Sequence, residues 1–417
     1  MIGFTTILLT LIVLSVIYFY KLAKLKPENF PPGPPRLPIW GSYWFLLLAN
    51  YNFTHKAAEY LRQKYNSNLI GIYEGNYPVV IVTTHALAKE ALSRDEFIGR
   101  PDNYISRNRS FGQLLGVALT DGPIWKEHRR FSLRQLRDYG FGRRFNTTER
   151  LYESEVKALI EFLQSDPNAN DLNIIEQRKL TFSDDHKSDL LDSYLSKMHE
   201  LLRDGLDLTS FTEKQLLWTI VDNFFPAPNI IEPSLSMLWV HLCMFPEVQV
   251  KVQEEIDRVV SRSRLPTLDD RKNMPYTEAV IRESLRFDGV VPINTPRRCL
   301  QDTTLGGYFI PENTILLISA WNANYDPKVW SDPGVFKPER FLNNEGILLK
   351  NDNILSFGGG KRLCVGETFS RNIMFLLLSG LLQNFTFKPA HEIPDRENKR
   401  WGFVVDILPF WIDAISR

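Results

Sequence analysis

The sequence predicts a mainly α-helical fold with small β-sheets, and three observations support this class. The 417 residues are 44% hydrophobic and 24% charged, which is typical of a globular protein with a large core. Apolar residues recur at helical spacing in long segments, including Glu247–Val260 and Tyr276–Phe287. Short β-branched runs flank Gly75 and Asn76 within residues 68–84, the pattern of a β-hairpin. We therefore expect helices to dominate and strands to form short hairpins.

The N-terminal residues predict a membrane anchor. Ile2–Tyr20 is uncharged, and a helix of that length just spans a hydrocarbon core of roughly 30 Å. Lysines at 21, 24 and 26 follow this run, and no small-residue cleavage site does, so a retained anchor is favoured over a cleaved signal peptide. The positive-inside rule keeps the rest of the chain in the cytosol. We expect an anchor over residues 1–20 and a basic, proline-rich linker over residues 21–38.

Residues 39–417 are expected to form one domain, because no repeat, low-complexity tract or clear interdomain linker interrupts them. A basic helix with proline at its start and a long apolar helix that is expected to be buried lie within this domain. The further elements expected in chain order are the hairpin at 68–84, a helix at 85–93, the basic helix at 123–138, helices at 247–260 and 276–287, strands within 303–319, and the apolar helix at 366–385.

Charge and cysteine content narrow the function classes. The formal net charge is zero, so no global field favours nucleic acid as a partner. Only three cysteines are present, Cys243, Cys299 and Cys364, and their wide spacing argues against a disulfide framework. The sequence therefore indicates a reducing compartment for the folded domain.

Cys364 lies in an unusual setting, the stretch LSFGGGKRLCVGETF. A cysteine before a helix is often a small buried hydrophobic residue. Here the glycines at 358–360 permit unusual backbone conformations, Arg362 adds a cation, and Gly366 opens a helix whose N-terminus stabilises negative charge. These features are expected to favour thiolate over thiol. No second cysteine or histidine is near, so an axial ligand to a planar cofactor such as haem fits better than a zinc site.

Four motifs, in this order along the chain, resemble those of the cytochrome P450 family, and most closely its membrane-anchored microsomal group, the animal family-2-like members. W-x-x-x-R occurs on the basic helix, E-x-x-R on the helix at 276–287, P-E-R-F follows, and F-x-x-G-x-R-x-C-x-G surrounds the cysteine. The residues that fill them are Trp125 and Arg129, then Glu283 and Arg286, then Arg340 within residues 338–341, and finally Phe357, Gly360, Arg362, Cys364 and Gly366.

The resemblance implies a P450 fold with an N-terminal transmembrane helix, and it assigns roles to these residues. Cys364 would be the thiolate ligand of haem b, in a loop shaped by Phe357, Gly360 and Gly366. The haem propionates would be bound by Trp125, Arg129, Arg297 and Arg362, with Arg298 as a near rival of Arg297. Glu283 and Arg286, which share a helix face, would pair and be joined by Arg340 in a structural cluster.

The basic helix carries a second pattern. Lys126, Arg130, Arg134 and Arg137 recur on a face different from that of Trp125. This face is either simply solvated or, as the resemblance implies, a docking surface for an acidic redox partner. NADPH–cytochrome P450 reductase would supply electrons from NADPH, with cytochrome b5 as an additional candidate partner. The protein would lie in the endoplasmic reticulum membrane as a single-pass protein with its catalytic body in the cytosol.

Two departures from the family pattern affect the expected chemistry. The segment PAPNII, residues 226–231, stands where the family has an acid and two threonines that relay protons, and it holds Asn229, Ile230 and Ile231 instead. Its prolines, and Pro233, are expected to break or kink the helix. A stretch of several dozen residues, which forms the roof of the substrate pocket in the family, is also missing near residue 170. A skipped exon, a faulty gene model and a true deletion all remain open.

We therefore expect a haem-thiolate monooxygenase that inserts one oxygen atom of O2 into an apolar small molecule, such as a steroid, lipid or xenobiotic. One alternative, suggested by the lost relay, is a P450-fold isomerase, dehydratase or specialised steroid-pathway enzyme. Another is a truncated, inactive haem-binding protein. The substrate is left open, because the segment that usually decides it is absent.

Overall fold

The computed structural model describes residues 2–24, 26–138, 210–351 and 353–417, together with residues 154, 156–158, 160–161, 194, 197 and 200–201. Helices predominate and the strands are short, as the sequence predicts. The principal helices are α1 (Ile2–Lys24), α2 (Tyr43–Ala49), α3 (Thr54–Tyr65), α4 (His85–Ser93), α5 (Tyr104–Asn108), α6 (Gly122–Asp138), α10 (Glu213–Phe224), α11 (Pro226–Met244), α12 (Pro246–Val259), α13 (Pro275–Phe287), α14 (Ala320–Asn324) and α15 (Glu367–Asn384).

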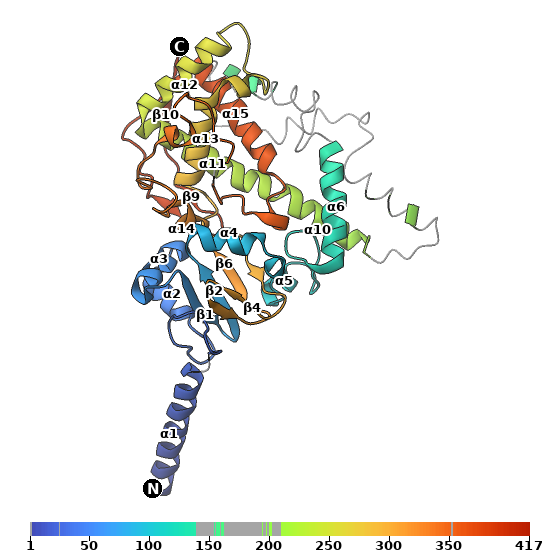
Figure 1. Ribbon diagram of the computed structural model, residues 1–417, viewed down its shortest axis with the longest axis vertical. Helices are drawn as coiled ribbons and strands as arrows, with labels where there is room; N and C mark the ends of the chain where they lie inside the picture. The colour runs from blue at the N-terminus through green and yellow to red at the C-terminus, as the bar shows by residue number, and fades with distance from the viewer. Residues whose placement is uncertain are drawn as a thin grey trace.

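The main sheet has four strands in the order β1-β2-β6-β3, and it lies in the same part of the molecule as α2, α3 and α4 (Figure 1). The strands are β1 (Leu69–Glu74), β2 (Tyr77–Val82), β3 (Arg297–Arg298) and β6 (Ile315–Ile318). β1 and β2 form the predicted antiparallel hairpin, β2 pairs with β6 in parallel, and β6 pairs with β3 antiparallel. The remaining strands form two-stranded sheets, namely β4 (Thr303–Leu305) with β5 (Tyr308–Ile310), β7 (Phe385–Pro389) with β10 (Ile412–Ser416), and β8 (Lys399–Arg400) with β9 (Asp406–Ile407).

The main sheet is buried on both faces because its side chains alternate between two apolar clusters. Ile70 and Ile72 pack with the alanines of α3, whereas Leu69 and Tyr73 pack with α4 on the other face. This explains why the hairpin reads as a nearly continuous apolar run.

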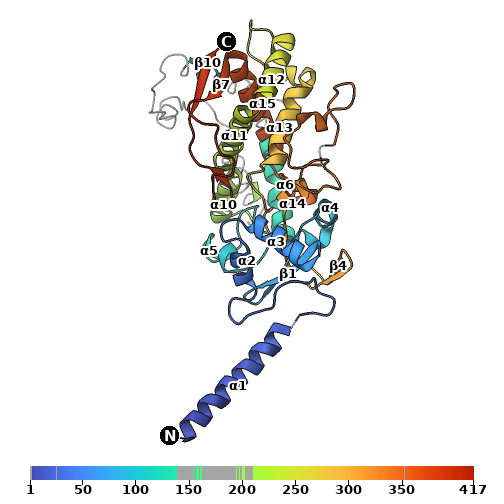
Figure 2. The ribbon, with the colours of Figure 1, turned by 90° about the vertical axis from the view of Figure 1, so that its left-hand side faces the viewer.

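Helices α11, α12, α13 and α15 form the second lobe, seen at the top of Figures 1 and 2. Its core is the largest apolar cluster of the described residues, and α15 contributes residues from most of its faces. The predicted burial of this apolar helix is therefore confirmed. α13 packs against α11, α12 and α15, which places the E-x-x-R segment at the centre of the lobe.

The proline-rich segment is packed against the sheet rather than standing free as a spacer. The carbonyl oxygen of Pro32 accepts a hydrogen bond from the Gly71 N–H of β1 at 2.9 Å. A Cβ on Gly33 would lie 2.1 Å from the Gly71 carbonyl oxygen, so only glycine fits this approach. The proline-rich part of the segment at 21–38 therefore packs against the folded body.

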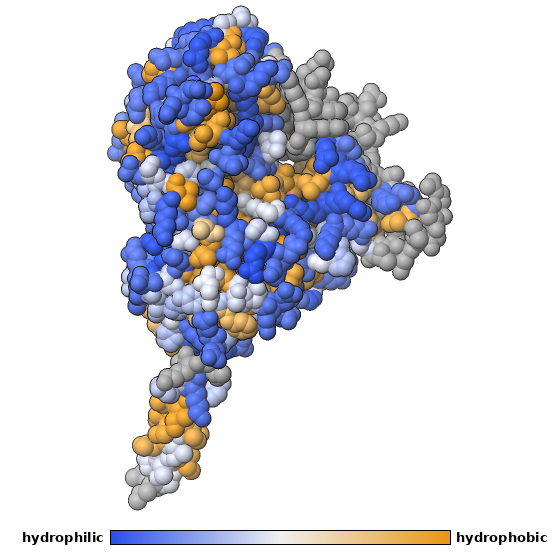
Figure 3. All heavy atoms as spheres, viewed as in Figure 1, coloured by the Kyte–Doolittle hydropathy of each residue, from blue (hydrophilic) through white to orange (hydrophobic). Residues whose placement is uncertain are grey.

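Helix α1 projects away from this body and is lined with hydrophobic residues (Figures 2 and 3). It extends past the predicted anchor end at residue 20 and includes Lys21 and Lys24. Among the described residues, no helix is both long enough and apolar enough to cross a membrane.

The expected helix break occurs at one proline only. α10 ends at Phe224 and α11 begins at Pro226, because proline has no N–H to continue the hydrogen-bond ladder. Pro226 and Pro228 occupy the first turn of α11, where N–H groups lack helical partners in any case. Pro233 lies inside α11 without ending it, so the predicted disruption does not take the form of a break at this residue.

The predicted gap near residue 170 and the roof that it would remove lie outside the described residues.

Candidate functional site

The Cys364 loop connects a short 3₁₀ turn, Gly360–Arg362, to the start of α15. The Cys364 N–H donates to the Phe357 carbonyl oxygen at 3.1 Å, which closes the loop on itself. Gly358 and Gly360 have φ values of +71° and +62°. A Cβ on Gly360 would lie 2.0 Å from the Leu92 carbonyl oxygen, so the loop requires glycine there both for its conformation and for its contact with α4.

The sulfur of Cys364 lies at the N-terminus of α15 and is accessible, unlike the buried Cys243 and Cys299. The prediction that its surroundings favour thiolate is wrong for the protein alone. Although the residue is exposed at the surface, the protein atoms around its thiol desolvate the anion and raise the pKa of Cys364, against the lowering effect of the Gly366 and Glu367 N–H groups and the Arg129 guanidinium. The loss of hydration destabilises the thiolate more than the two N–H groups and the guanidinium stabilise it. A bound metal ion would reverse this balance, because it deprotonates a coordinating thiol outright.

Four arginines from distant parts of the chain converge beside this loop. Arg129 of α6 donates to the Leu363 carbonyl oxygen at 2.6 Å, and Arg362 donates to the Ile98 and Thr120 carbonyl oxygens. Arg297 of β3 donates to the Gly359 carbonyl oxygen at 2.9 Å. The fourth is Arg100, which donates to backbone carbonyl oxygens of residues 118, 295 and 296.

Arg100 was not predicted from the sequence, because it belongs to none of the four motifs. The only local signal is a lone arginine between Gly99 and Pro101, which is too common to interpret. Its burial, with 7% of the residue exposed, becomes meaningful only next to the other three arginines.

The arginine cluster is electrostatically unbalanced. Burial, and then repulsion from neighbouring arginines, lowers the pKa of Arg100 to about 9, of Arg297 to about 10 and of Arg362 to about 8. Among the described residues, their guanidinium groups donate to backbone carbonyl oxygens, which solvate a cation but do not neutralise it. Such a cluster could bind an anion with more than one acidic group.

Two donors in this cluster have no hydrogen-bond partner among the described residues. These are Trp125 Nε1 and Arg297 Nη1, both fully buried atoms. The Arg362 guanidinium lies 3.6 Å from the centroid of the Trp125 ring, which fixes both side chains. Buried donors without a hydrogen-bond partner are rare. Here two of them lie beside excess positive charge, and a carboxylate ligand would satisfy both the donors and the charge.

Arg297 and Arg298 are clearly distinguished by their partners. Arg298 pairs with Asp121 at 2.8 Å and donates to Asn313, so its charge is already satisfied. Arg297 turns into the cluster and keeps a free donor. The geometry therefore favours Arg297 as the anion ligand.

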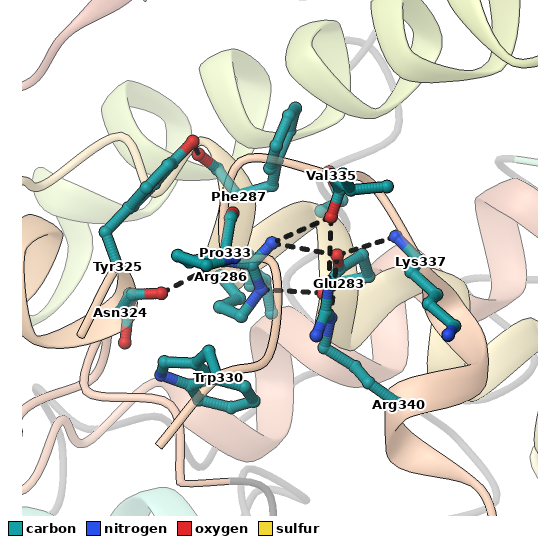
Figure 4. Close-up of polar contacts among 12 residues, drawn as sticks. Glu283, Arg286, Phe287, Asn324, Tyr325, Trp330, Pro333, Val335, Lys337 and Arg340 are labelled. Atoms are coloured by element: carbon teal, nitrogen blue, oxygen red, sulfur yellow. Dashed lines mark hydrogen bonds and ion pairs between the residues drawn. The ribbon is translucent and has the colours of Figure 1, made fainter. Parts of the chain in front are cut away.

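A second polar cluster, shown in Figure 4, joins α13 to the segment that contains Arg340. Glu283 accepts two hydrogen bonds from Arg286, at 2.7 and 2.8 Å, and one from Arg340 at 3.1 Å. The side chains of Glu283 and Arg286 are completely buried, and that of Arg340 nearly so. The remaining guanidinium donors reach backbone carbonyl oxygens of residues 324, 331–333 and 335. These bonds tie α13 to the irregular segment that follows α14.

The second face of α6 is exposed to solvent. Lys126, Arg130, Arg134 and Arg137 are all exposed, whereas Trp125 on the same helix is buried. α6 therefore presents a basic outer face and an inner face that carries two candidate anion ligands.

The positions of the lost proton relay offer no acid or alcohol. The Asn229 amide donates to the Phe225 carbonyl oxygen at 2.7 Å, and the residue is exposed. Ile230 packs against the apolar cluster of Met237, Val240, Val290 and Ile407. The Asn229 amide is thus engaged with the backbone one turn earlier in the chain, and Ile230 is engaged in packing.

A single thiol also limits the kind of metal centre. Among the residues that the structure describes, no group of three or more His, Cys, Asp or Glu side chains could hold a metal ion. One cysteine beside a multi-arginine cluster could hold a prosthetic group by one sulfur ligand and by its acidic substituents. Haem b fits this donor set, because it combines an iron that accepts a thiolate with two propionates.

The chain belongs to the cytochrome P450 family, since the family model described as "Cytochrome P450" matches residues 31–174 and 172–413. It is 30% identical to "Cytochrome P450 2J3" of Rattus norvegicus, in an alignment that covers 92% of each chain. It is also 29% identical to "Cytochrome P450 2J2" of Homo sapiens, covering 95% of this chain and 93% of the relative. "Farnesoate epoxidase" of Bombyx mori is 30% identical, with coverage of 94% and 95%.

The family assignment makes this chain a haem-binding oxidoreductase of the monooxygenase type. Haem b is the cofactor of the family, and electrons from NADPH through a reductase are consistent with it.

Proposed function

We propose that this protein is a haem-thiolate monooxygenase in which Cys364 ligates the haem iron and the arginine cluster binds the propionates. The observation that carries the proposal is the pair of unpartnered buried donors, Trp125 Nε1 and Arg297 Nη1, next to an accessible thiol. When bound, thiolate-ligated haem activates O2 so that one oxygen atom enters an apolar substrate and the other leaves as water.

The residues of the chain then have distinct tasks. Trp125, Arg129, Arg297 and Arg362 orient the prosthetic group by its acidic edge, and Arg100 adds to the positive field. Phe357, Gly360 and Gly366 shape the loop, and the N–H groups of Gly366 and Glu367 stabilise charge on the sulfur. The cluster of Glu283, Arg286 and Arg340 keeps the segment after α14 in place.

The test is the spectrum of the reduced protein with carbon monoxide. The full chain should show the red-shifted Soret band of thiolate ligation, and Cys364→Ser should lose it. Cys243→Ser and Cys299→Ser are matched controls, since both thiols are buried elsewhere, and both should keep the band. Equal behaviour of all three variants would refute the ligand assignment.

The substrate is proposed to be an apolar small molecule such as a steroid, lipid or xenobiotic. The relative named farnesoate epoxidase supports oxidation of an apolar carbon skeleton. Turnover with NADPH and reductase on a panel of such compounds, followed by mass spectrometry, tests this class. Oxygenation of polar compounds alone would contradict it.

The electron donor is proposed to be NADPH–cytochrome P450 reductase, docked on the exposed basic face of α6, with cytochrome b5 as a second partner for this face. Charge complementarity accelerates such encounters, and salt weakens them. Arg130→Glu with Arg134→Glu should slow reduction on the order of tenfold and weaken its salt dependence. Lys64→Glu on α3 is the control and should leave the rate unchanged. An equal effect of both changes would contradict the assignment.

Attachment to the endoplasmic reticulum membrane, with the body in the cytosol, is proposed to occur through α1. Support comes from its exposed apolar side chains and from the lysines at its end. Alkaline carbonate should leave the full chain in the membrane pellet and release a chain that lacks residues 1–24. Glycosylation at Asn52, Asn108, Asn146 or Asn384 would reverse the proposed topology.

A second candidate function follows from the occupied relay positions. With the Asn229 amide bonded to the Phe225 carbonyl oxygen and Ile230 in an apolar cluster, the acid and alcohol of the family pattern are lacking. A P450-fold isomerase or dehydratase, which needs no such relay, suits this arrangement. Rapid conversion of a lipid hydroperoxide without turnover on NADPH would favour this candidate over the monooxygenase.

A missing roof segment near residue 170 is proposed as well, supported by a family match in two parts that meet at residues 172–174. Activity of the full chain and of a chain with the segment restored from a genomic transcript should be compared. If only the restored chain turns over substrate, the present form is an inactive haem-binding protein.

A further inference from the structure

A cavity of about 160 Å³ lies between α3, the end of α13, the segment after α14 and the loop that leads into β8. It contains none of the residues of the Cys364 loop or the arginine cluster. One part of its wall is aromatic, formed by Phe53, Trp321 and Tyr325, and another is aliphatic, formed by Met237 and Val290. A void of this size exceeds the ~10–15 Å³ that one water molecule needs, and its wall favours a ligand with an apolar body.

Charged side chains surround the same cavity, and cations outnumber carboxylates. Lys56, Arg396 and Lys399 contribute three positive charges, and Asp288 and Glu397 contribute two negative charges. His55 also lines the wall, but burial lowers its pKa to about 3, so it is an uncharged ring at neutral pH. The lining therefore carries one excess positive charge.

Asp288 is already saturated with donors. Its carboxylate, 2% exposed, lies 2.9 Å from His241 Nε2, 2.7 Å from Lys399 Nζ and 3.4 Å from Arg396 Nε. These contacts hold the pKa of Asp288 well below its usual range, with hydrogen bonding and charge overcoming burial. A cationic ligand would find no free carboxylate here.

Glu397, in contrast, pairs only weakly with the cations of the cavity. Its contacts with Lys56 at 2.8 Å and Arg396 at 3.5 Å involve a carboxylate side chain that is 51% exposed. Exposed pairs of this kind contribute little to stability and exchange readily with other anions. Arg396 itself is held in place, since its guanidinium lies 4.0 Å from the Phe287 ring centroid and donates to the Tyr325 hydroxyl.

We propose that this cavity binds a small monoanionic carboxylate with an aromatic or short aliphatic body. The ligand carboxylate replaces that of Glu397 on Lys56 and Arg396, and its apolar body lies against Trp321 and Met237. Because Met237 is on α11 and Asp288 directly follows α13, an occupant contacts α11 and the segment after α13 without touching the Cys364 loop.

Binding is measured by titration calorimetry on the purified full chain loaded with haem, while the Soret band is recorded in parallel. The probes are 4-phenylbutyrate, its neutral amide and the matching amine. The carboxylate should bind without shifting the Soret band, whereas the amide and the amine should bind at least tenfold more weakly. Equal affinity for all three, or binding accompanied by a Soret shift, would overturn the proposal.

Two variants and a control locate the site. Lys56→Gln should weaken carboxylate binding about 3- to 5-fold, as expected for a partly exposed contact. Lys64→Gln, on the same helix but outside the cavity, should leave binding unchanged. Val405→Phe should fill the cavity and abolish binding while the carbon monoxide spectrum of the haem stays normal. If Lys56→Gln and Lys64→Gln behaved alike, or if Val405→Phe bound the carboxylate normally, the proposed site would be wrong.

Discussion

Trp125→Phe should have different effects on the stability of the haem-free chain and on its affinity for haem. The residue is 3% exposed, and its Nε1 has no hydrogen-bond partner among the described residues. Phenylalanine removes this donor but keeps an aromatic face for the Arg362 guanidinium, which lies 3.6 Å from the Trp125 ring centroid. The same N–H that destabilises the protein without haem should therefore be the one that helps to hold haem.

The two expected effects have opposite signs. Removing an unsatisfied buried donor should relieve ~1–3 kcal/mol in the haem-free chain. The smaller phenylalanine ring buries less apolar surface and loses a similar amount of stabilising free energy. The net change in the free energy of unfolding should therefore be less than about 1 kcal/mol. In the haem-loaded chain, the loss of a hydrogen bond to a charged propionate costs ~1.5–3 kcal/mol. Haem affinity should then fall about 10- to 100-fold.

The assay combines urea unfolding of the haem-free chain with the rate of haem transfer to an excess of an apo-globin. Trp330→Phe is the matched control, because Trp330 is equally buried but its Nε1 donates to the Ala323 carbonyl oxygen at 3.2 Å. The control should lose stability and keep its haem affinity. If Trp125→Phe lost more than about 3 kcal/mol of stability and kept its haem affinity, the reasoning would fail.

Three further predictions concern stability. Glu283→Gln leaves the buried guanidiniums of Arg286 and Arg340 without their carboxylate and should lower the free energy of unfolding in urea by about 3–5 kcal/mol. Asp102→Asn, at an exposed ion pair, should lower it by under ~1 kcal/mol. Equal losses of stability would contradict the role of burial. Burial lowers the pKa of His55 in the folded protein to about 3. Below the unfolded-state pKa of ~6.5 the unfolded chain binds a proton that the folded protein does not, so the free energy of unfolding falls as the pH falls. Relative to His55→Gln, the wild type should lose about 2 kcal/mol between pH 6.5 and pH 5, and parallel pH curves would refute this. Asp222→Asn should speed limited proteolysis near Gly116, because Asp222 accepts hydrogen bonds from Arg109 and from two N–H groups of that loop; an unchanged cleavage pattern would argue against this.

The local elements could be predicted because their signals lie within a few residues. Periodicity located α12, α13 and α15 to within a residue or so at each end, and Gly75-Asn76 located the β1–β2 hairpin. The sequence could not separate a break from a kink at the prolines, and the structure shows that α11 begins at Pro226 and continues through Pro233.

The candidate site was only partly accessible from the sequence. Motif spacing singled out Cys364 and Arg362 together, and the i, i+3 spacing predicted the Glu283–Arg286 pair. Arg100 was missed, and Arg297 could not be separated from Arg298. Each of these depends on which neighbours the folded chain brings near, and those neighbours lie far away in sequence.

The sequence by itself determined the positions of the helices, the family resemblance and the glycine loop around Cys364, because dihedral preferences and side-chain periodicity act over short distances. Tertiary structure alone decided that Arg100, Arg129, Arg297 and Arg362 share one unbalanced cluster and that Trp125 keeps an unpaired donor there. It also decided that the pKa of Cys364 rises rather than falls. Charge repulsion and desolvation depend on distance and burial, and both are set only when segments more than two hundred residues apart pack together.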